Sequence, residues 1–145
     1  MKETTILNTA SNKNDTAETP DTKRAMTPDK KRFLVVDDDP FVNETIVQLL
    51  QSMKFEIVAR AYNGEQAIEL FVRYRERINI VLMDVNMPRR NGVSAAGYIR
   101  RICPSVKIVL MSSDPNNALF ASELDNVDFI GKPFTGESLL SRLAD

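Results

Sequence analysis

The feature that most restricts the fold is a short apolar run that stops at a carboxylate. Residues 78–88 read I-N-I-V-L-M-D-V-N-M-P, and no polar residue interrupts Ile80 to Met83 before Asp84. Unbroken apolar runs of this length are typical of strands buried on both faces, as in parallel sheets. Pro88 cannot donate to a strand ladder, so the chain leaves the sheet in a loop. The carboxylate needs a cation or a hydrogen-bond partner, because its burial is otherwise unfavourable.

Four other short apolar segments alternate with segments in which apolar residues recur at helical spacing. We predict strands over 33–36, 55–61, 80–84, 106–111 and 127–130. We predict helices that start at Pro40 behind an Asp39 N-cap, include 68–72, cover 93–102 and 116–124, and follow a Thr135 N-cap. Strands joined by crossover helices predict an α/β fold: a doubly wound, five-stranded parallel sheet with helices on both faces.

Composition excludes several kinds of chemistry. The 145-residue chain has no histidine and one cysteine, Cys103, which excludes Ser-His-Asp and Cys-His catalysis and histidine or cysteine metal sites. A bound metal would therefore need oxygen ligands. The net charge of −1 gives no general attraction to nucleic acid or membranes. No apolar run reaches the roughly 20 residues of a membrane span and no secretion signal is present, so we expect a cytoplasmic protein.

Residues 1–31 differ in composition from the rest of the chain. They are polar and contain no aromatic residue, so we predict a disordered N-terminal tail followed by one domain over 32–145.

Polar residues follow the apolar runs at the ends of four predicted strands: Asp37 and Asp38, Asp84, Ser112, and Lys132. The second strand ends at Ala61 without a polar group, which suits an edge strand. The order 2-1-3-4-5 would then place the polar strand ends together, because the carboxyl ends of parallel strands share one edge and ligands bind where the strand order reverses.

The predicted cluster suits phosphoryl transfer. Three close carboxylates repel one another, and a hard divalent cation such as Mg²⁺ or Mn²⁺ would relieve this repulsion. Lys132 adds a point charge for phosphate, and Ser112 adds a neutral donor. A carboxylate such as Asp84 can act as the nucleophile and form an aspartyl phosphate.

The segments V-V-D-D, L-M-D-V-N-M-P, M-S-S and G-K-P-F, in this order and spacing, resemble the receiver domain of two-component response regulators, a flavodoxin-like family that includes single-domain, CheY-like members. The resemblance covers roughly residues 32–145. It implies these roles: Asp84 as phosphoacceptor and metal ligand, Asp38 as direct metal ligand, Asp37 acting through water, Asn86 through its backbone carbonyl, Ser112 as the mobile hydroxyl, Lys132 as its cationic partner and Phe129 as the aromatic switch.

Some residues have a structural interpretation beside the functional one. Phe129 is equally a candidate for the core. The pairs at 89–90 and 100–101 are interpreted as a solvated basic face rather than a nucleic-acid patch, because no aromatic residues are interleaved with them. Gly97 inside a helix is unfavourable by ~1 kcal/mol, for which close packing is one explanation. The last helix, 135–145, is shorter than the family leads us to expect.

Three functions remain open. The first is a receiver that takes a phosphoryl group from a sensor histidine kinase or histidine phosphotransfer protein onto Asp84, and then changes its contacts with a downstream protein. We expect no output domain in this chain and no enzymatic activity beyond its own Mg²⁺-dependent phosphorylation and dephosphorylation. The second is a receiver-like interaction module that is not phosphorylated. The third, a hydrolase with an aspartyl-phosphate intermediate, is disfavoured because Asn86 stands where such enzymes carry a second aspartate.

Overall fold

The computed structural model describes residues 30–144, and all of these except Lys30 belong to the compact unit Lys31–Asp145. The predicted disordered tail therefore lies, except for its last two residues, outside the described part of the chain. Among the described residues, no helix is both long and apolar enough to cross a bilayer.

Five parallel strands form one sheet in the order β2-β1-β3-β4-β5, which confirms the predicted topology. The strands are β1 (Arg32–Val36), β2 (Glu56–Ala61), β3 (Ile80–Asp84), β4 (Lys107–Ser112) and β5 (Val127–Gly131). Every residue of β1 and β3 is buried, as the unbroken apolar runs predicted. The order reverses between β1 and β3, so the ends of these two central strands flank the switch point.

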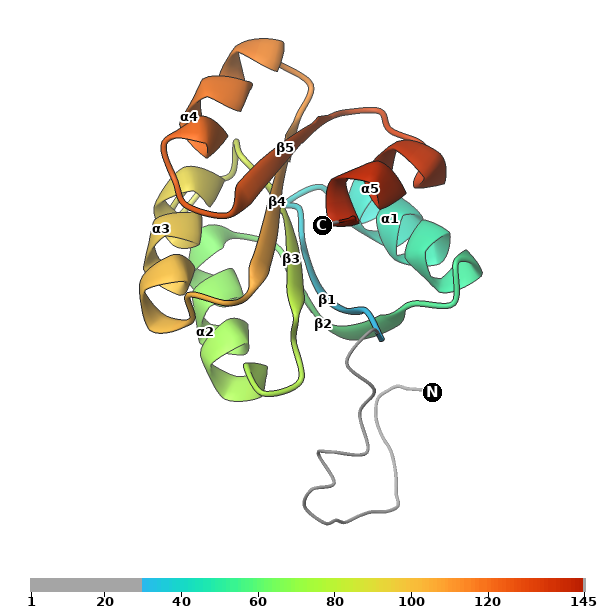
Figure 1. Ribbon diagram of the computed structural model, residues 1–145, viewed down its shortest axis with the longest axis horizontal. Helices are drawn as coiled ribbons and strands as arrows, with labels where there is room; N and C mark the ends of the chain where they lie inside the picture. Colours follow the sequence, from blue (N-terminus) through green and yellow to red (C-terminus); the bar gives the residue numbers. More distant parts are fainter. Residues whose placement is uncertain (1–29, 145) are drawn as a thin grey trace. The chain divides into compact units, whose positions relative to one another are not determined.

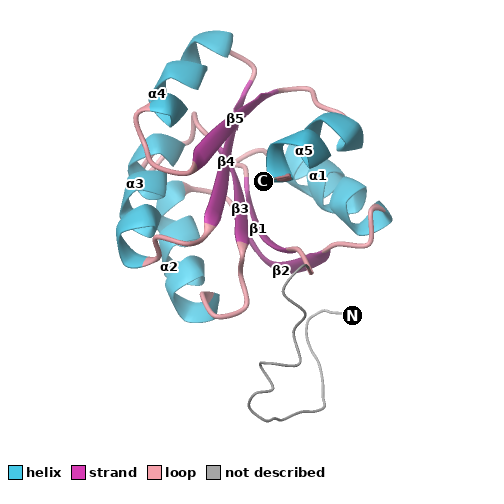
Figure 2. Ribbon diagram, in the orientation of Figure 1, coloured by secondary structure: helices cyan, strands magenta, loops and turns pink. Residues whose placement is uncertain are grey.

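Helices cover both faces of the sheet, with α1 and α5 on one side and α2, α3 and α4 on the other (Figures 1 and 2). Their bounds are α1 Pro40–Ser52, α2 Gly64–Tyr74, α3 Gly92–Ile102, α4 Ala118–Ser122 and α5 Gly136–Leu143, and a 3-10 turn, η2, spans Pro115–Asn117. Side chains of successive strand residues alternate between the two faces. Phe33 and Val35 thus pack with α1 and α5, whereas Leu34 and Val36 pack with the opposite cluster.

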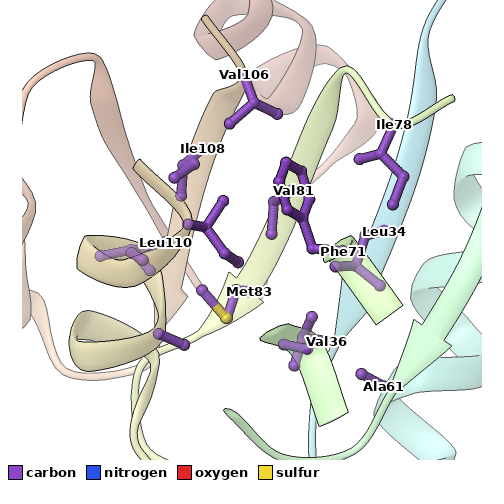
Figure 3. Packing of buried hydrophobic residues seen from close by; sticks show 14 of the residues in the cluster. Leu34, Val36, Ala61, Phe71, Ile78, Val81, Met83, Val106, Ile108 and Leu110 are labelled. Atoms are coloured by element: carbon purple, nitrogen blue, oxygen red, sulfur yellow. The ribbon is translucent and has the colours of Figure 1, made fainter. Parts of the chain in front are cut away.

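The larger core cluster lies between the sheet and α2, α3 and α4 (Figure 3). Val81, Met83, Ile108 and Leu110 project from β3 and β4, and Phe71 reaches them from α2. All five side chains are fully buried. This packing holds the carboxyl ends of β3 and β4 rigidly beside each other.

Side chains that precede the helices fix where they begin. Asp39 accepts hydrogen bonds from the N–H groups of Phe41 and Val42, and Pro40 occupies the first turn. Thr135 forms a capping box with Ser138 at the start of α5. Both predicted N-caps are therefore confirmed. Each lies in a loop that follows a strand end with polar residues, Asp39 after β1 and Thr135 after β5.

The fourth and fifth helical segments differ from the prediction. The segment predicted as one helix over 116–124 is a 3-10 turn followed by the five-residue α4. Pro115 starts the turn, and the apolar residues that follow do not form one buried face, because Leu119 and Phe120 are exposed and Ala121 is the one buried residue of α4. In α5, Leu139 and Leu143 are buried as predicted, whereas Leu140 is 45% exposed. With only eight residues, α5 covers the sheet with a narrow stripe.

One expectation about α3 is wrong, and Arg100 makes contacts that the sequence did not predict. A methyl group added at Gly97 would meet no atom within 4 Å, so close packing does not explain this glycine. Arg100 is half-buried, and its guanidinium donates to the carbonyls of Cys103, Pro104, Asp125 and Asn126. Arg100 thereby joins the loop after α3 to the loop after α4.

Candidate active site at the carboxyl edge of the sheet

The structure brings the predicted acidic residues together. One carboxylate oxygen from each of Asp37, Asp38 and Asp84 lies within 4.8 Å of the others. Asp37 and Asp84 are buried, with exposed fractions of 1% and 6%, and Asp38 is exposed. The cluster therefore opens to solvent on the side of Asp38.

Lys132 enters the same cluster from the end of β5. Its Nζ donates to Asp37 Oδ2 at 2.8 Å and lies 3.6 Å from Asp84 Oδ1. The backbone N–H of Lys132 donates to the carbonyl of Ser112, and the Lys132–Pro133 peptide is cis. Burial alone would lower the pKa of Lys132, but the hydrogen bond to Asp37 and the charges of Asp84 and Asp37 raise it above 10.5. Lys132 is thus a fixed cation at neutral pH.

Among the described carboxylates, Asp84 has the most strongly shifted pKa. Burial raises its pKa from 3.8 to about 6; Lys132 opposes the rise, while the charges of Asp37 and Asp38 add to it. The N–H of Asn86 donates to the carboxylate and favours its charged form. Asp84 is therefore ionised at neutral pH but is held in a site that disfavours its charge.

The set of donors fits a hard divalent cation. Carboxylate oxygens are the ligands that Mg²⁺ and Mn²⁺ prefer, and such ions commonly use one or two carboxylates together with water and phosphate oxygens. Both oxygens of Asp37 already hold protein donors, the N–H of Asp39 at 3.0 Å and Lys132 at 2.8 Å. Asp38 and Asp84 are consequently the carboxylates with the greater capacity to bind an ion directly.

Ser112 lies at the end of β4, beside the cluster, and is 1% exposed. Its Oγ accepts hydrogen bonds from the backbone N–H of Asp114 at 3.0 Å and from Nδ2 of Asn117 at 2.8 Å. A hydroxyl oxygen has two lone pairs and one proton. Because two donors occupy the lone pairs, the hydroxyl proton is the group that Ser112 can offer to a ligand.

A family model described as "Response regulator receiver domain" matches residues 33–144 of this chain.

The chain belongs to the response regulator receiver domain family.

Curated relatives and solved structures agree with this assignment. Chemotaxis protein CheY of Bacillus subtilis is 34% identical over 113 residues, which cover 76% of this chain and 92% of that protein. A chain of the CheX–CheY–BeF3–Mg complex of Borrelia burgdorferi superposes with a TM-score of 0.71 at 24% identity, and the match covers 78% of this chain and 86% of that one. The complex of Ypd1 with the Ssk1 receiver domain of Saccharomyces cerevisiae gives 0.69 at 20% identity, with coverages of 78% and 86%. The two structures support the fold alone.

In this receiver, Asn43 is a functional neighbour that the sequence patterns did not single out. It is fully buried on α1, and its Nδ2 donates to the carbonyls of Asp37 at 3.2 Å and Ala61 at 3.0 Å. Its Oδ1 accepts from Nε of Arg60 at 3.0 Å. Asn43 thus fixes the backbone that carries Asp37. Its place one turn before Ile46 on the buried face of α1 is a signal that could have identified it.

The remaining predicted site residues lie at the rim of the receiver site. Asn86 is exposed in the loop after β3, and Phe129 is half-buried on β5 against the larger core cluster. The packing of Phe129 is compatible with both a core role and a switch role, which stay predictions.

An apolar groove adjoins Lys132. It has a volume of about 360 Å³ and is lined by side chains of α1 and of the segment from β5 to α5, together with Ser113: Phe41, Val42, Thr45, Ile46, Leu49, Ser113, Lys132, Pro133 and Phe134. Phe41, at the start of α1, is 79% exposed. The receiver thus carries an exposed aromatic side chain in the lining of a groove that reaches Lys132.

Proposed function

We propose that this receiver accepts a phosphoryl group on Asp84 from a phosphohistidine of a partner protein. The observation that carries the proposal is the arrangement of Asp84 itself: a buried carboxylate, 3.6 Å from the ammonium of Lys132 and next to two further carboxylates. A site that only stabilises the fold would gain more from apolar residues, because buried charges are expensive to desolvate.

The residues of the chain suit an in-line transfer. An oxygen of ionised Asp84 bonds to phosphorus while the phosphorus–nitrogen bond of the donor breaks. The electron pair stays on the imidazole nitrogen, which takes a proton from water. Lys132 then faces the charge of the bound phosphoryl group, and the Ser112 hydroxyl donates its proton to a phosphoryl oxygen. The protein would catalyse only its own modification, so we do not propose an enzyme that turns over other substrates.

Asp38, Asp84 and the Asn86 carbonyl would hold Mg²⁺ or Mn²⁺, with Asp37 acting through water, and the bound ion would neutralise charge on the phosphoryl oxygens. A role through water suits Asp37, because both of its carboxylate oxygens already accept hydrogen bonds from protein donors.

The groove beside Lys132 is the proposed contact surface for the phosphohistidine protein. A donor residue on a folded protein must bring its neighbouring surface against the rim of the site, and the exposed Phe41 and the groove lie at that rim. Ypd1, the partner of the similarly folded Ssk1 receiver, is described as a histidine phosphotransfer protein. We therefore expect a sensor histidine kinase or a histidine phosphotransfer protein to bind at this groove. A downstream protein would bind the phosphorylated form of the receiver.

Intact mass after incubation with Mg²⁺ and acetyl phosphate tests the proposal. The parent protein should gain one phosphoryl group, about 80 Da, and Asp84→Asn should not. Phe41→Ala should slow transfer from a phosphohistidine protein more than transfer from acetyl phosphate, because the small donor does not contact the groove.

A receiver-like interaction module that is not phosphorylated is the alternative. It is favoured if the parent protein gains no mass and isothermal titration detects no binding of Mg²⁺.

A further inference from the structure

Two arginines converge on one tyrosine at the exposed face of α3. The guanidinium carbon of Arg90, in the loop before α3, and that of Arg101, in its last turn, each lie 5.8 Å from the ring centroid of Tyr98. All three residues are exposed. Among the described residues, neither guanidinium forms an ion pair with a carboxylate. The ring attracts both cations while they repel each other, so an anionic ligand would stabilise the arrangement.

The charge around this arrangement has one sign. α3 contains no acidic residue and carries two arginines in its last turn. On α2, which lies beside α3 (Figure 1), Glu65 pairs with Arg89 at 2.7 Å and Glu69 lies 3.8 Å from Arg73. The acidic side chains of α2 are therefore already paired and do not neutralise the arginines beside Tyr98.

The backbone at Arg90 is unfavourable for an arginine. Its φ of 81° lies in the left-handed region, which favours glycine. The carbonyl of Arg90 lies against α2, where a Cβ at Gly64 would come within 2.1 Å of it. Because glycine would fit this turn better, the backbone does not require the arginine side chain. Its contacts lie on the surface, with Tyr98 and with Oγ of Ser94 at 3.4 Å.

Gly97 leaves the middle of the same helix face open. Ser94, Gly97, Tyr98 and Arg101 recur at the three- and four-residue spacing of one face. A Cβ at Gly97 would meet no atom within 4 Å, so packing within the fold does not require glycine there, although glycine is unfavourable in a helix. A missing side chain lets the backbone of another helix approach closely.

We propose that this α3 face binds an acidic helix of a partner protein. The face consists of Arg90, Ser94, Gly97, Tyr98 and Arg101. The carboxylates of such a helix would accept hydrogen bonds from the two guanidiniums, and its backbone would lie over the open position. The proposal does not depend on phosphorylation of the receiver.

Other partners fit the α3 face less well. A second copy of this chain does not supply an acidic helix, because no helix within residues 30–144 has more acidic residues than the two of α2, which are paired. A nucleic acid would need a more extended basic surface, and the net charge of the chain is −1.

Fluorescence anisotropy at low ionic strength tests the proposal with a labelled, stapled helical peptide of glutamate and alanine. The parent should bind this peptide and should not bind its counterpart in which lysine replaces glutamate. Arg90→Gln and Arg101→Gln should each raise the Kd about three- to fivefold, the factor for a solvent-exposed ion pair. Lys54→Gln is the matched control: it removes the same charge from the exposed turn after α1, on the opposite side of the sheet, and should bind like the parent.

Two uncharged substitutions separate docking from general attraction and from folding. Tyr98→Leu keeps the net charge and should raise the Kd about twofold or more. Gly97→Gln should weaken binding although urea unfolding should show a fold at least as stable as the parent, because glutamine is the better helix former. A parent that does not bind the acidic peptide, or a Lys54→Gln protein that loses as much affinity as Arg90→Gln, would overturn the proposal. Tighter binding of a short DNA duplex than of the peptide would overturn it in favour of a nucleic-acid surface.

Discussion

Replacement of Asp84 by asparagine should stabilise the metal-free protein at neutral pH. Burial raises the pKa of Asp84 from 3.8 to about 6, with Lys132 opposing and Asp37 and Asp38 adding to the rise. Each pKa unit corresponds to about 1.4 kcal/mol, so the ionised carboxylate lowers the free energy of unfolding by about 3 kcal/mol. Asparagine keeps the shape and removes the charge, while Lys132 retains its hydrogen bond to Asp37.

The sign of the pH dependence follows from the raised pKa. The folded protein holds the Asp84 proton more tightly than the unfolded chain does. The parent and Asp84→Asn should therefore be similar in stability below about pH 4, where both states are protonated. The stability of the parent relative to the variant should fall between about pH 4 and pH 6, and the difference should stay constant above this window.

Urea unfolding of both proteins in the presence of a chelator, from pH 4 to pH 8, measures the difference directly. Mg²⁺ added at pH 8 should stabilise the parent by linkage and stabilise Asp84→Asn much less, because the variant lacks one charged ligand. A stability difference that is the same at pH 4 and pH 8 would refute the argument, since the effect would then come from packing rather than from ionisation.

Substitutions at four further positions test the supporting structure by urea unfolding. Gly92→Ala should destabilise the folded protein by about 1–3 kcal/mol or more, because its Cβ would lie 2.1 Å from the backbone oxygen of Asp84. Gly97→Ala on the same helix would meet no atom within 4 Å and should stabilise the folded protein by up to about 1 kcal/mol. Equal effects of the two substitutions would contradict this reasoning. Asn43→Ala should destabilise by about 1–3 kcal/mol, because it removes a buried amide that holds two carbonyls, and a neutral result would count against that role. Arg100→Lys should retain little of the stability that Arg100→Ala loses, because an ammonium cannot reach the four carbonyls that the guanidinium contacts; full retention would be inconsistent with this.

The sequence predicted the fold because strand and helix signals in this chain are local. Unbroken apolar runs identified the buried strands, and caps such as Asp39 and Thr135 identified helix starts. The alternation of strands and helices is compatible with few sheet topologies. The polar residues at the strand ends indicated which edge of the sheet would carry the site. The prediction was weakest over 116–124, where Pro115 starts a 3-10 turn and the helix that follows is short, with Leu119 and Phe120 exposed to solvent.

The sequence by itself determined which chemical groups meet at the carboxyl edge of the sheet: three carboxylates, a hydroxyl and an ammonium. Only the tertiary structure decided how they are paired and held. Lys132 bonds Asp37 more closely than Asp84, and the buried amides of Asn43 and Asn117 hold the backbone of Asp37 and the hydroxyl of Ser112. These contacts depend on which face of a helix or turn is buried and on elements distant in sequence, so no local pattern of residues specifies them.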